Sequence, residues 1–269
     1  IYGKNGEPNF NIVKESTDSS SEESSFSIDI LQLKNVNVAY QNWKEDEDYI
    51  VSFKECFVSP NSLIDSIDAT LEFEGNVPSL MIGGGKSEKA IDLDGEFKIW
   101  LNEDSLRFNY SGQFASGDAN IKGKLNFYDK NEQWDIQCEM LNHNVQDLVN
   151  ILPSEYKDEV LSSFEGDISA SLKMLGEKTE DKFPSVTVDF NFSNGSFKSQ
   201  NEQFRQVFVS GMYFQPNTKS ISGAKARIDK YSLNYNGIVV HGHGTIKELK
   251  NPFISATVQS SFNLKKLYG

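Results

Sequence analysis

The sequence predicts a mainly β protein: a curved antiparallel meander that forms an elongated groove or a partly open barrel or sandwich. Apolar and polar residues alternate through roughly a dozen segments spaced about 8 to 14 residues apart. The chain holds 19 Phe and 10 Tyr against 4 Met, and strands favour such a composition. Asn-Gly pairs and short polar stretches separate the segments, as hairpin turns do. Composition alone does not choose between groove, barrel and sandwich.

The size and charge of the chain limit its function. Its 269 residues are enough for a sizeable core, and its formal net charge is −13. A surface of this charge repels phosphate backbones, so nucleic acid is not an expected partner. The two cysteines, Cys56 and Cys138, lie far apart and form no C-x-x-C motif. We expect free cysteines at strand positions rather than a zinc site, and whether they pair stays open.

The first 25 residues differ from the rest of the chain. Residues 1–15 carry the pair Asn5-Gly6, which predicts a tight turn within an N-terminal strand or turn segment. Residues 16–25 contain only Ser, Glu, Asp and one Thr, so they predict a flexible acidic linker. Residues 26–269 are predicted to form a single elongated antiparallel β domain.

Each strand segment of that domain has one apolar and one polar face. A long extended run begins at Phe26, and further strands are expected over residues 207–214, 226–246 and 253–264. Between them, the sequence predicts apolar faces made by Ile67, Ala69, Leu71 and Phe73; by Phe97, Ile99 and Leu101; by Leu106, Phe108, Tyr110 and Phe114; by Ile121, Gly123, Leu125 and Phe127; by Trp134, Ile136, Cys138 and Met140; by Ile168, Ala170, Leu172 and Met174; and by Val186, Val188, Phe190 and Phe192.

Turn residues connect these strands. Asn194-Gly195 and Asn236-Gly237 lie between alternating segments, and both predict two-residue type I′ hairpins. The polar residues 102–104 and 129–131 predict slightly longer hairpin loops. The chain is therefore expected to reverse direction at each of these four places.

A short helical insert near residues 144–164 interrupts the alternation. Asn144 is placed to cap a first helix, and Pro153 separates it from a second helix that Gly166 is expected to end. Two short amphipathic helices predict a plug over exposed strand ends, with a gate over an opening as the functional alternative. The apolar residues of this plug or gate are Val145, Leu148, Val149, Leu152, Tyr156, Val160 and Phe164.

The same region resembles the AsmA-like family of Gram-negative envelope proteins, which is related to TamB and to bridge-like lipid-transfer proteins. The shared pattern is a short helix ending in Leu-Pro, a second helix, a Gly, a strand, a Gly-containing loop and Pro-led strands ending in Asn-Gly-x-Phe. Its counterparts here are Leu152-Pro153, Gly166, Gly176, Pro184 and Asn194-Gly195-Ser196-Phe197. An N-terminal family motif is met by Gly6, Asn9, Phe10 and Ile12. The resemblance extends from about residue 3 to residue 200.

This resemblance implies a periplasmic protein tethered to the inner membrane by one helix. That helix is absent from the sequence, which begins with Ile1, so we expect a fragment whose targeting segments are missing. The family's sheet curls into an apolar groove, which implies phospholipid or another lipid as partner, transfer of phospholipid with a role in outer-membrane homeostasis, and envelope proteins at the groove ends. The lining then consists of Phe97, Ile99, Leu101, Phe108, Tyr110, Leu125, Phe127, Ile168, Leu172, Val186, Val188, Phe190 and Phe192.

No catalytic constellation stands out in the sequence. His241 and His243 project from one face of a strand, but no third metal ligand is near them in the sequence. His143 is expected at the surface or as a capping residue. Gly-x-Ser-x-Gly is absent, and the carboxylates alternate with apolar residues as solubilising side chains do. We therefore expect no enzyme, no cofactor and no metal.

Two other functions remain open. One is a non-enzymatic β-sandwich that binds carbohydrate or protein as a module of a cell-surface protein, and the other is a β-rich glycoside hydrolase. Sugar sites use aromatic platforms, and the three tryptophans, Trp43, Trp100 and Trp134, are dispersed among different segments. This dispersal argues mildly against both.

Overall fold

The structure is a computed structural model. It describes residues 30–42, 47–60, 67–79, 81–82, 85–86, 90–128, 131–151, 163–199, 202–218, 223–249 and 251–261. The N-terminal segment, the acidic linker and the second predicted helix up to residue 162 lie outside these ranges, as do the plug residues Leu152, Tyr156 and Val160.

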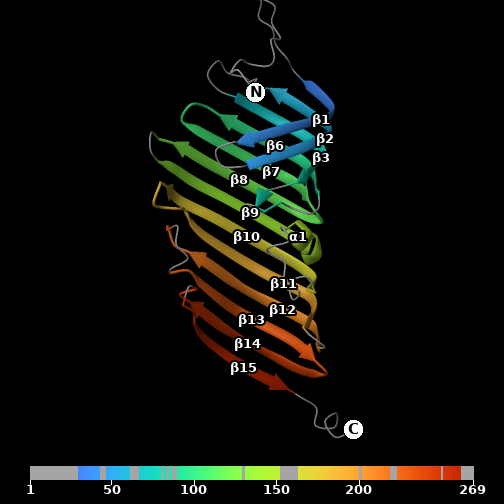
Figure 1. Ribbon diagram of the computed structural model, residues 1–269, viewed down its shortest axis with the longest axis vertical. Helices are drawn as coiled ribbons and strands as arrows, with labels where there is room; N and C mark the ends of the chain where they lie inside the picture. Colours follow the sequence, from blue (N-terminus) through green and yellow to red (C-terminus); the bar gives the residue numbers. More distant parts are fainter. Residues whose placement is uncertain are drawn as a thin grey trace, which may run out of the picture.

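One antiparallel sheet of 13 strands makes up most of the described chain (Figure 1). Each strand pairs with the strand that precedes it in the sheet and the one that follows, and β1 and β15 form the two ends, so the sheet stays open. Its strands, in spatial order, are β1 (Leu31–Asn42), β2 (Glu47–Pro60), β3 (Ile67–Ser79), β6 (Ile91–Leu101), β7 (Ser105–Phe114), β8 (Gly117–Phe127), β9 (Glu132–Asn144), β10 (Glu165–Lys178), β11 (Ser185–Ser199), β12 (Glu202–Gln215), β13 (Lys225–Tyr235), β14 (Ile238–Lys247) and β15 (Phe253–Ser261).

The only other strands in the described ranges are β4 (Met81–Ile82) and β5 (Gly85–Lys86), which pair with each other. The long sheet is twisted and curved, and its strands cross the long axis of the molecule (Figure 1). Within the described residues, no second large sheet packs against it. The predicted antiparallel meander is confirmed, in its open form rather than as a closed barrel or a sandwich.

Short connections explain why the strands follow one another in order. Asn236-Gly237 joins β13 to β14 as predicted, with φ of 50° at Asn236 and 82° at Gly237. Asn102 begins the predicted loop between β6 and β7, and its Oδ1 accepts the backbone N–H of Ser105 at 2.7 Å. Turns of two or three residues are so short that each strand pairs with the strand that follows it in the sequence.

The second predicted Asn-Gly hairpin is wrong. Asn194-Gly195 lies inside β11, where the pairing with β12 shifts between Phe192 and Gly195. Asn194 has a φ of 52°, so the pair forms a β-bulge and the strand runs on to Ser199. This bulge places Asn194 at a positive φ, and a type I′ turn places both of its central residues there, so Asn-Gly suits either.

The first predicted helix is confirmed as α1 (Val145–Ile151). The Oδ1 of Asn144 accepts the N–H of Gln146 at 2.8 Å, which is the predicted cap. Val149 and Ile151 are buried, whereas Val145 and Leu148 are half-buried. Within the described residues, no helix has the length and apolar character needed to span a bilayer.

Gly166 does not end a helix as predicted but is the second residue of β10. Its φ is 140°, and the pairing with β11 shifts next to it. A Cβ on Gly166 would lie 2.8 Å from the Phe192 ring and 2.9 Å from the Cα of Gly195. Glycine is therefore needed here because two strands approach each other closely, not because a helix stops.

Candidate functional site

An unbroken row of apolar residues crosses the whole sheet. Residues paired across antiparallel strands lie on the same face, so the register can be followed from one end strand to the other. The row contains one residue from each of the 13 strands: Leu31, Val58, Leu71, Phe97, Tyr110, Ile121, Cys138, Leu172, Val188, Tyr213, Ala226, Ile246 and Ile254.

All thirteen predicted lining residues fall on this face. Ile99 pairs with Phe108, and Leu101 lies two residues further along the same face of β6. Ala170 pairs with Phe190 and Ile168 pairs with Phe192. Of the thirteen, only Tyr110 and Phe192 are buried, and the others are half-buried. We define this surface as the apolar face.

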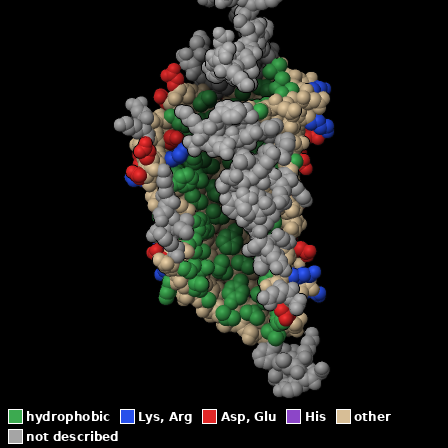
Figure 2. Space-filling model, in the orientation of Figure 1, with side chains coloured by type: hydrophobic (Ala, Val, Ile, Leu, Met, Phe, Trp, Pro, Cys, Tyr) green, Lys and Arg blue, Asp and Glu red, His purple; other side chains and the backbone are tan. Residues whose placement is uncertain are grey.

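The apolar face forms a continuous band along the molecule. Figure 2 shows hydrophobic side chains gathered along the long axis, with charged side chains along both sides of the band. The opposite face of the sheet is mainly polar, although it also carries exposed apolar residues such as Phe57 and Phe253. Its cross-strand pairs include Glu72 with Glu96, Lys122 with Gln137, and Ser171 with Asp189. The sheet is thus amphipathic, with one face suited to hydrocarbon and the other to water.

Glycines opposite aromatic residues shape the apolar face, and the sequence did not reveal this. A Cβ on Gly123 would collide with the ring of Phe108, its partner on β7. A Cβ on Gly242 would lie 2.8 Å from the Oη of Tyr231, its partner on β13. The rings therefore occupy the space above the glycines. Each glycine is visible in the sequence, but its partner is known only once the register is known.

An aromatic stack lies where β11, β12 and β13 meet the helical insert. Phe197 stacks on Phe164 with 4.8 Å between ring centroids and on Phe204 with 4.5 Å. Phe204 continues the stack to Tyr235 at 5.3 Å. Phe164, a predicted plug residue, also contacts the lining residue Phe192 edge-on at 5.8 Å. The end of the insert is therefore joined to the apolar face by ring contacts.

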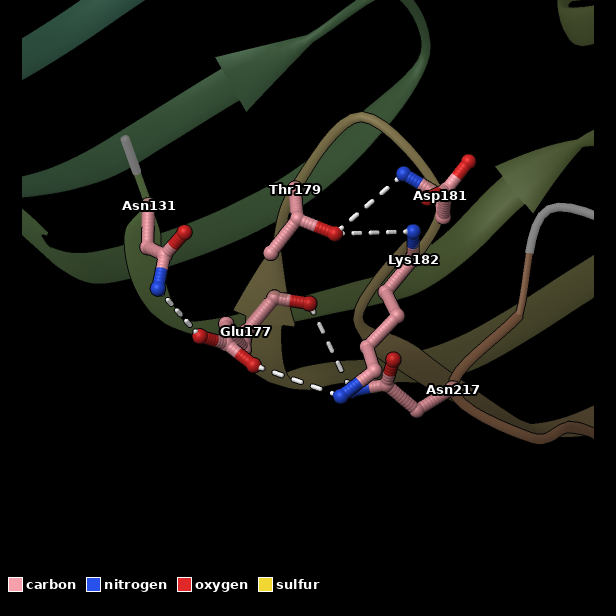
Figure 3. Close-up of polar contacts among 6 residues, drawn as sticks. All are labelled: Asn131, Glu177, Thr179, Asp181, Lys182 and Asn217. Atoms are coloured by element: carbon pink, nitrogen blue, oxygen red, sulfur yellow. Dashed lines mark hydrogen bonds and ion pairs between the residues drawn. The ribbon is translucent and has the colours of Figure 1, made fainter.

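The opposite ends of the strands carry a polar cluster (Figure 3). Glu177 at the end of β10 accepts a hydrogen bond from Asn131 Nδ2 at 2.7 Å and lies 3.6 Å from Lys182 Nζ. Asn217 Nδ2 donates to the backbone carbonyl of Glu177 at 3.4 Å. The cluster links three connections at this end of the strands, β8 to β9, β10 to β11 and β12 to β13. We call it the Glu177 cluster.

His143 is buried, not at the surface as predicted. Its side chain is fully enclosed, and Nε2 lies 3.0 Å from the carbonyl oxygen of Asp118. The prediction failed because the pairing of β9 with β10 shifts between Met140 and His143, with a φ of 56° at Asn142, and this irregularity turns His143 to the apolar face opposite Ile168. The absence of a side chain at Gly117 makes room for the imidazole, since a Cβ there would lie 2.8 Å from it.

The other two histidines lie on the polar face of β14. His241 pairs with Gln259 and His243 with Thr257, and His241 Nε2 lies 3.0 Å from Gln259 Oε1. In the part of the chain that the structure describes, no three His, Cys, Asp or Glu residues gather as a metal site would need.

Both cysteines are free thiols on the apolar face. Cys56 pairs with Phe73, and Cys138 pairs with Ile121 and Leu172. Burial raises the pKa of both thiols, and the charge of Glu139 adds to the rise in the pKa of Cys138. Cys56 is 1% exposed, whereas Cys138 is only half-buried. The reactivity of the Cys138 thiol should therefore fall when a ligand covers the apolar face.

The tryptophans do not gather into a platform. Trp100 lies on the polar face, with the Arg107 guanidinium 5.0 Å above its ring. Trp134 pairs with Leu125 on the apolar face and contacts Phe183 edge-on. Trp43 lies outside the described residues.

Comparisons of the chain with protein-family models, with curated proteins and with solved structures find no match.

Proposed function

We propose that the apolar face binds the acyl chains of lipids. The observation that supports this is the row of 13 apolar residues, one on every strand of an open sheet. An apolar surface of this extent costs free energy in water unless something covers it. Hydrocarbon chains cover it without any directed polar contact, and the lipid headgroup stays in water beside the charged margins of the face.

The energetics and the size of the face fit this role. Exposing acyl chains costs about 0.8 kcal/mol per CH₂, so a phospholipid with two chains costs on the order of 20 kcal/mol to extract into water. Thirteen strands spaced about 4.8 Å apart give a row roughly 58 Å long. An acyl chain spans half of a bilayer hydrocarbon core that is about 30 Å thick. The row is therefore longer than one acyl chain.

The resemblance to the AsmA-like family gives this binding a biological setting. We propose a periplasmic protein, tethered to the inner membrane, that contributes to phospholipid transfer and outer-membrane homeostasis with envelope proteins at the groove ends. The helical insert then acts as a plug or gate beside the face, through α1 and Phe164. This role requires shielding of hydrocarbon and no catalytic residue.

The test compares two variants on neighbouring positions of β10. Leu172→Glu places a charge on the apolar face, and Ser171→Glu places the same charge on the polar face. Organic extracts of the purified proteins are analysed by mass spectrometry. We expect phospholipid with the wild type and with Ser171→Glu and much less with Leu172→Glu. Folded protein without lipid that binds glycans on an array would favour a carbohydrate-binding module instead.

A second readout uses the native thiol. In a Cys56→Ser background, maleimide labelling of Cys138 is followed with and without vesicles of phosphatidylethanolamine and phosphatidylglycerol. Lipid on the apolar face should slow the labelling several-fold. Unchanged labelling in the presence of bound lipid would place the lipid elsewhere on the protein.

A further inference from the structure

Among the described residues, β15 is an edge strand of the sheet. All nine of its residues are exposed, and its outer backbone groups face no strand among the described residues. On its apolar side, Ile254 and Val258 are 63% and 62% exposed. They continue the apolar face because Ile254 pairs with Ile246, and Val258 pairs with Gly242.

The opposite edge of the sheet differs. β1 carries Lys34, which forms an ion pair with Glu55 at 3.2 Å, and Asn35, whose φ of 51° breaks the extended backbone. Charges and backbone irregularities are the devices by which edge strands avoid pairing. β15 contains no charged residue and no proline, and none of its residues has a positive φ. Its edge is therefore open to a further strand, whereas that of β1 is protected.

We propose that β15 pairs with β15 of a second copy of the chain, antiparallel and centred on Thr257. Antiparallel pairing about a residue keeps paired side chains on one face. Centring on Thr257 pairs all nine residues, with Ile254 opposite Ser260 of the second copy and Ala256 opposite its Val258. The two apolar faces then lie on the same side and form one continuous surface.

The absence of charge on β15 favours its pairing with β15 of a second copy. β15 itself is uncharged, so the centre of this contact brings no like charges together, although each chain carries −13 overall. Pairing of β15 with itself is also closed by two-fold symmetry, whereas pairing of β15 with β1 would continue without end. Protection of the β1 edge disfavours that open assembly.

Site-specific cross-linking tests the register. In a Cys56→Ala, Cys138→Ala background, Thr257→Cys places two thiols opposite each other at the two-fold axis. We expect a disulfide-linked dimer under mild oxidation with Thr257→Cys and little with Ser255→Cys, whose thiols would be about 13 Å apart along the strands. Equal cross-linking by both variants would contradict this register.

Mass in solution tests the edge itself. Light scattering on the full chain should show a mass approaching twice that of one chain as protein concentration rises. Val258→Lys places a lysine on the apolar side of the β15 edge and should shift the chain to monomer. Val38→Lys, the matched change on β1, where Val38 is 43% exposed, should leave the dimer intact. A monomer at every concentration, or a dimer lost only with Val38→Lys, would overturn the proposal.

Discussion

The ring of Phe108 on β7 lies over Gly123, its cross-strand partner on β8. The same arrangement recurs on the apolar face where Phe190 on β11 lies beside Gly211 on β12, whose Cβ would be 3.1 Å from the ring. A glycine in a strand lacks a side chain to pack, and an aromatic neighbour fills the space that it leaves. These pairs stabilise a sheet that has no second large sheet against it within the described residues.

Gly123→Ala tests whether the ring depends on this space. The added Cβ collides with the Phe108 ring, which must move, so we expect the free energy of unfolding to fall by about 1–3 kcal/mol. Urea denaturation measures it. In a Phe108→Ala background the same change should cost much less, because nothing remains to collide with. Equal costs in both backgrounds would show that the ring is not responsible.

Much of this architecture follows from the sequence because two of its patterns are local. Period-two alternation determines which face each residue of a strand occupies, as Val186, Val188, Phe190 and Phe192 illustrate. Short turns such as Asn236-Gly237 then determine which strands are neighbours. Together they place all thirteen lining residues on one face.

The features that the sequence did not predict depend on the relation between strands. The enclosure of His143 depends on Gly117 of the neighbouring strand β8, and the open form of the sheet depends on there being no second layer within the described residues. Asn194-Gly195 has the composition of a hairpin turn, yet β11 continues through it because the strand still finds partners on β12 up to Ser199. Local propensity cannot distinguish a turn from a bulge when both need the same backbone angle.

The two Asn-Gly pairs should respond differently to the same substitution. Gly237→Ala forces alanine into a φ of 82° in an exposed turn, which should cost about 1 kcal/mol. Gly195 does not have a positive φ, but Gly195→Ala brings a Cβ against the Phe192 ring and within 2.8 Å of the Val207 carbonyl oxygen, so its cost should be larger. Urea midpoints of the two variants decide the order. A larger loss for Gly237→Ala would contradict the assignment of Asn194-Gly195 as a buried bulge.

The Glu177 cluster should restrain the connections that it joins. Its ion pair with Lys182 is exposed, so Glu177→Ala should change the free energy of unfolding by at most about 1 kcal/mol. Hydrogen exchange should nevertheless accelerate at Asn131 and Lys182, whose side chains lose the Glu177 carboxylate as partner. Glu74→Ala, which removes a comparable exposed pair with Lys54 on β2, is the control and should leave exchange at these residues unchanged.

Tyr110 should make the stability of the sheet depend on pH at alkaline values. It is 7% exposed, and its Oη lies 2.6 Å from the carbonyl oxygen of Gln113 and 3.0 Å from that of Asp94. Burial, with a smaller contribution from the charge of Asp94, raises the pKa of Tyr110 to about 12.

The unfolded chain loses the Tyr110 proton near pH 10, so between about pH 10 and pH 12 the folded state binds more protons than the unfolded state. The contribution of Tyr110 to stability is therefore full below pH 10 and falls as pH rises through this window.

Tyr110→Phe isolates this effect from the other tyrosines. At neutral pH the variant should lose about 0.5–1.5 kcal/mol, because the hydroxyl no longer donates to a carbonyl. Urea denaturation of both proteins from pH 8 to pH 11.5 gives the difference between their free energies of unfolding. That difference should shrink and then reverse as pH rises, because only the wild type must keep a buried phenol protonated. A difference that stays constant over the range would show that the phenol of Tyr110 titrates in the folded protein as it does in the unfolded chain.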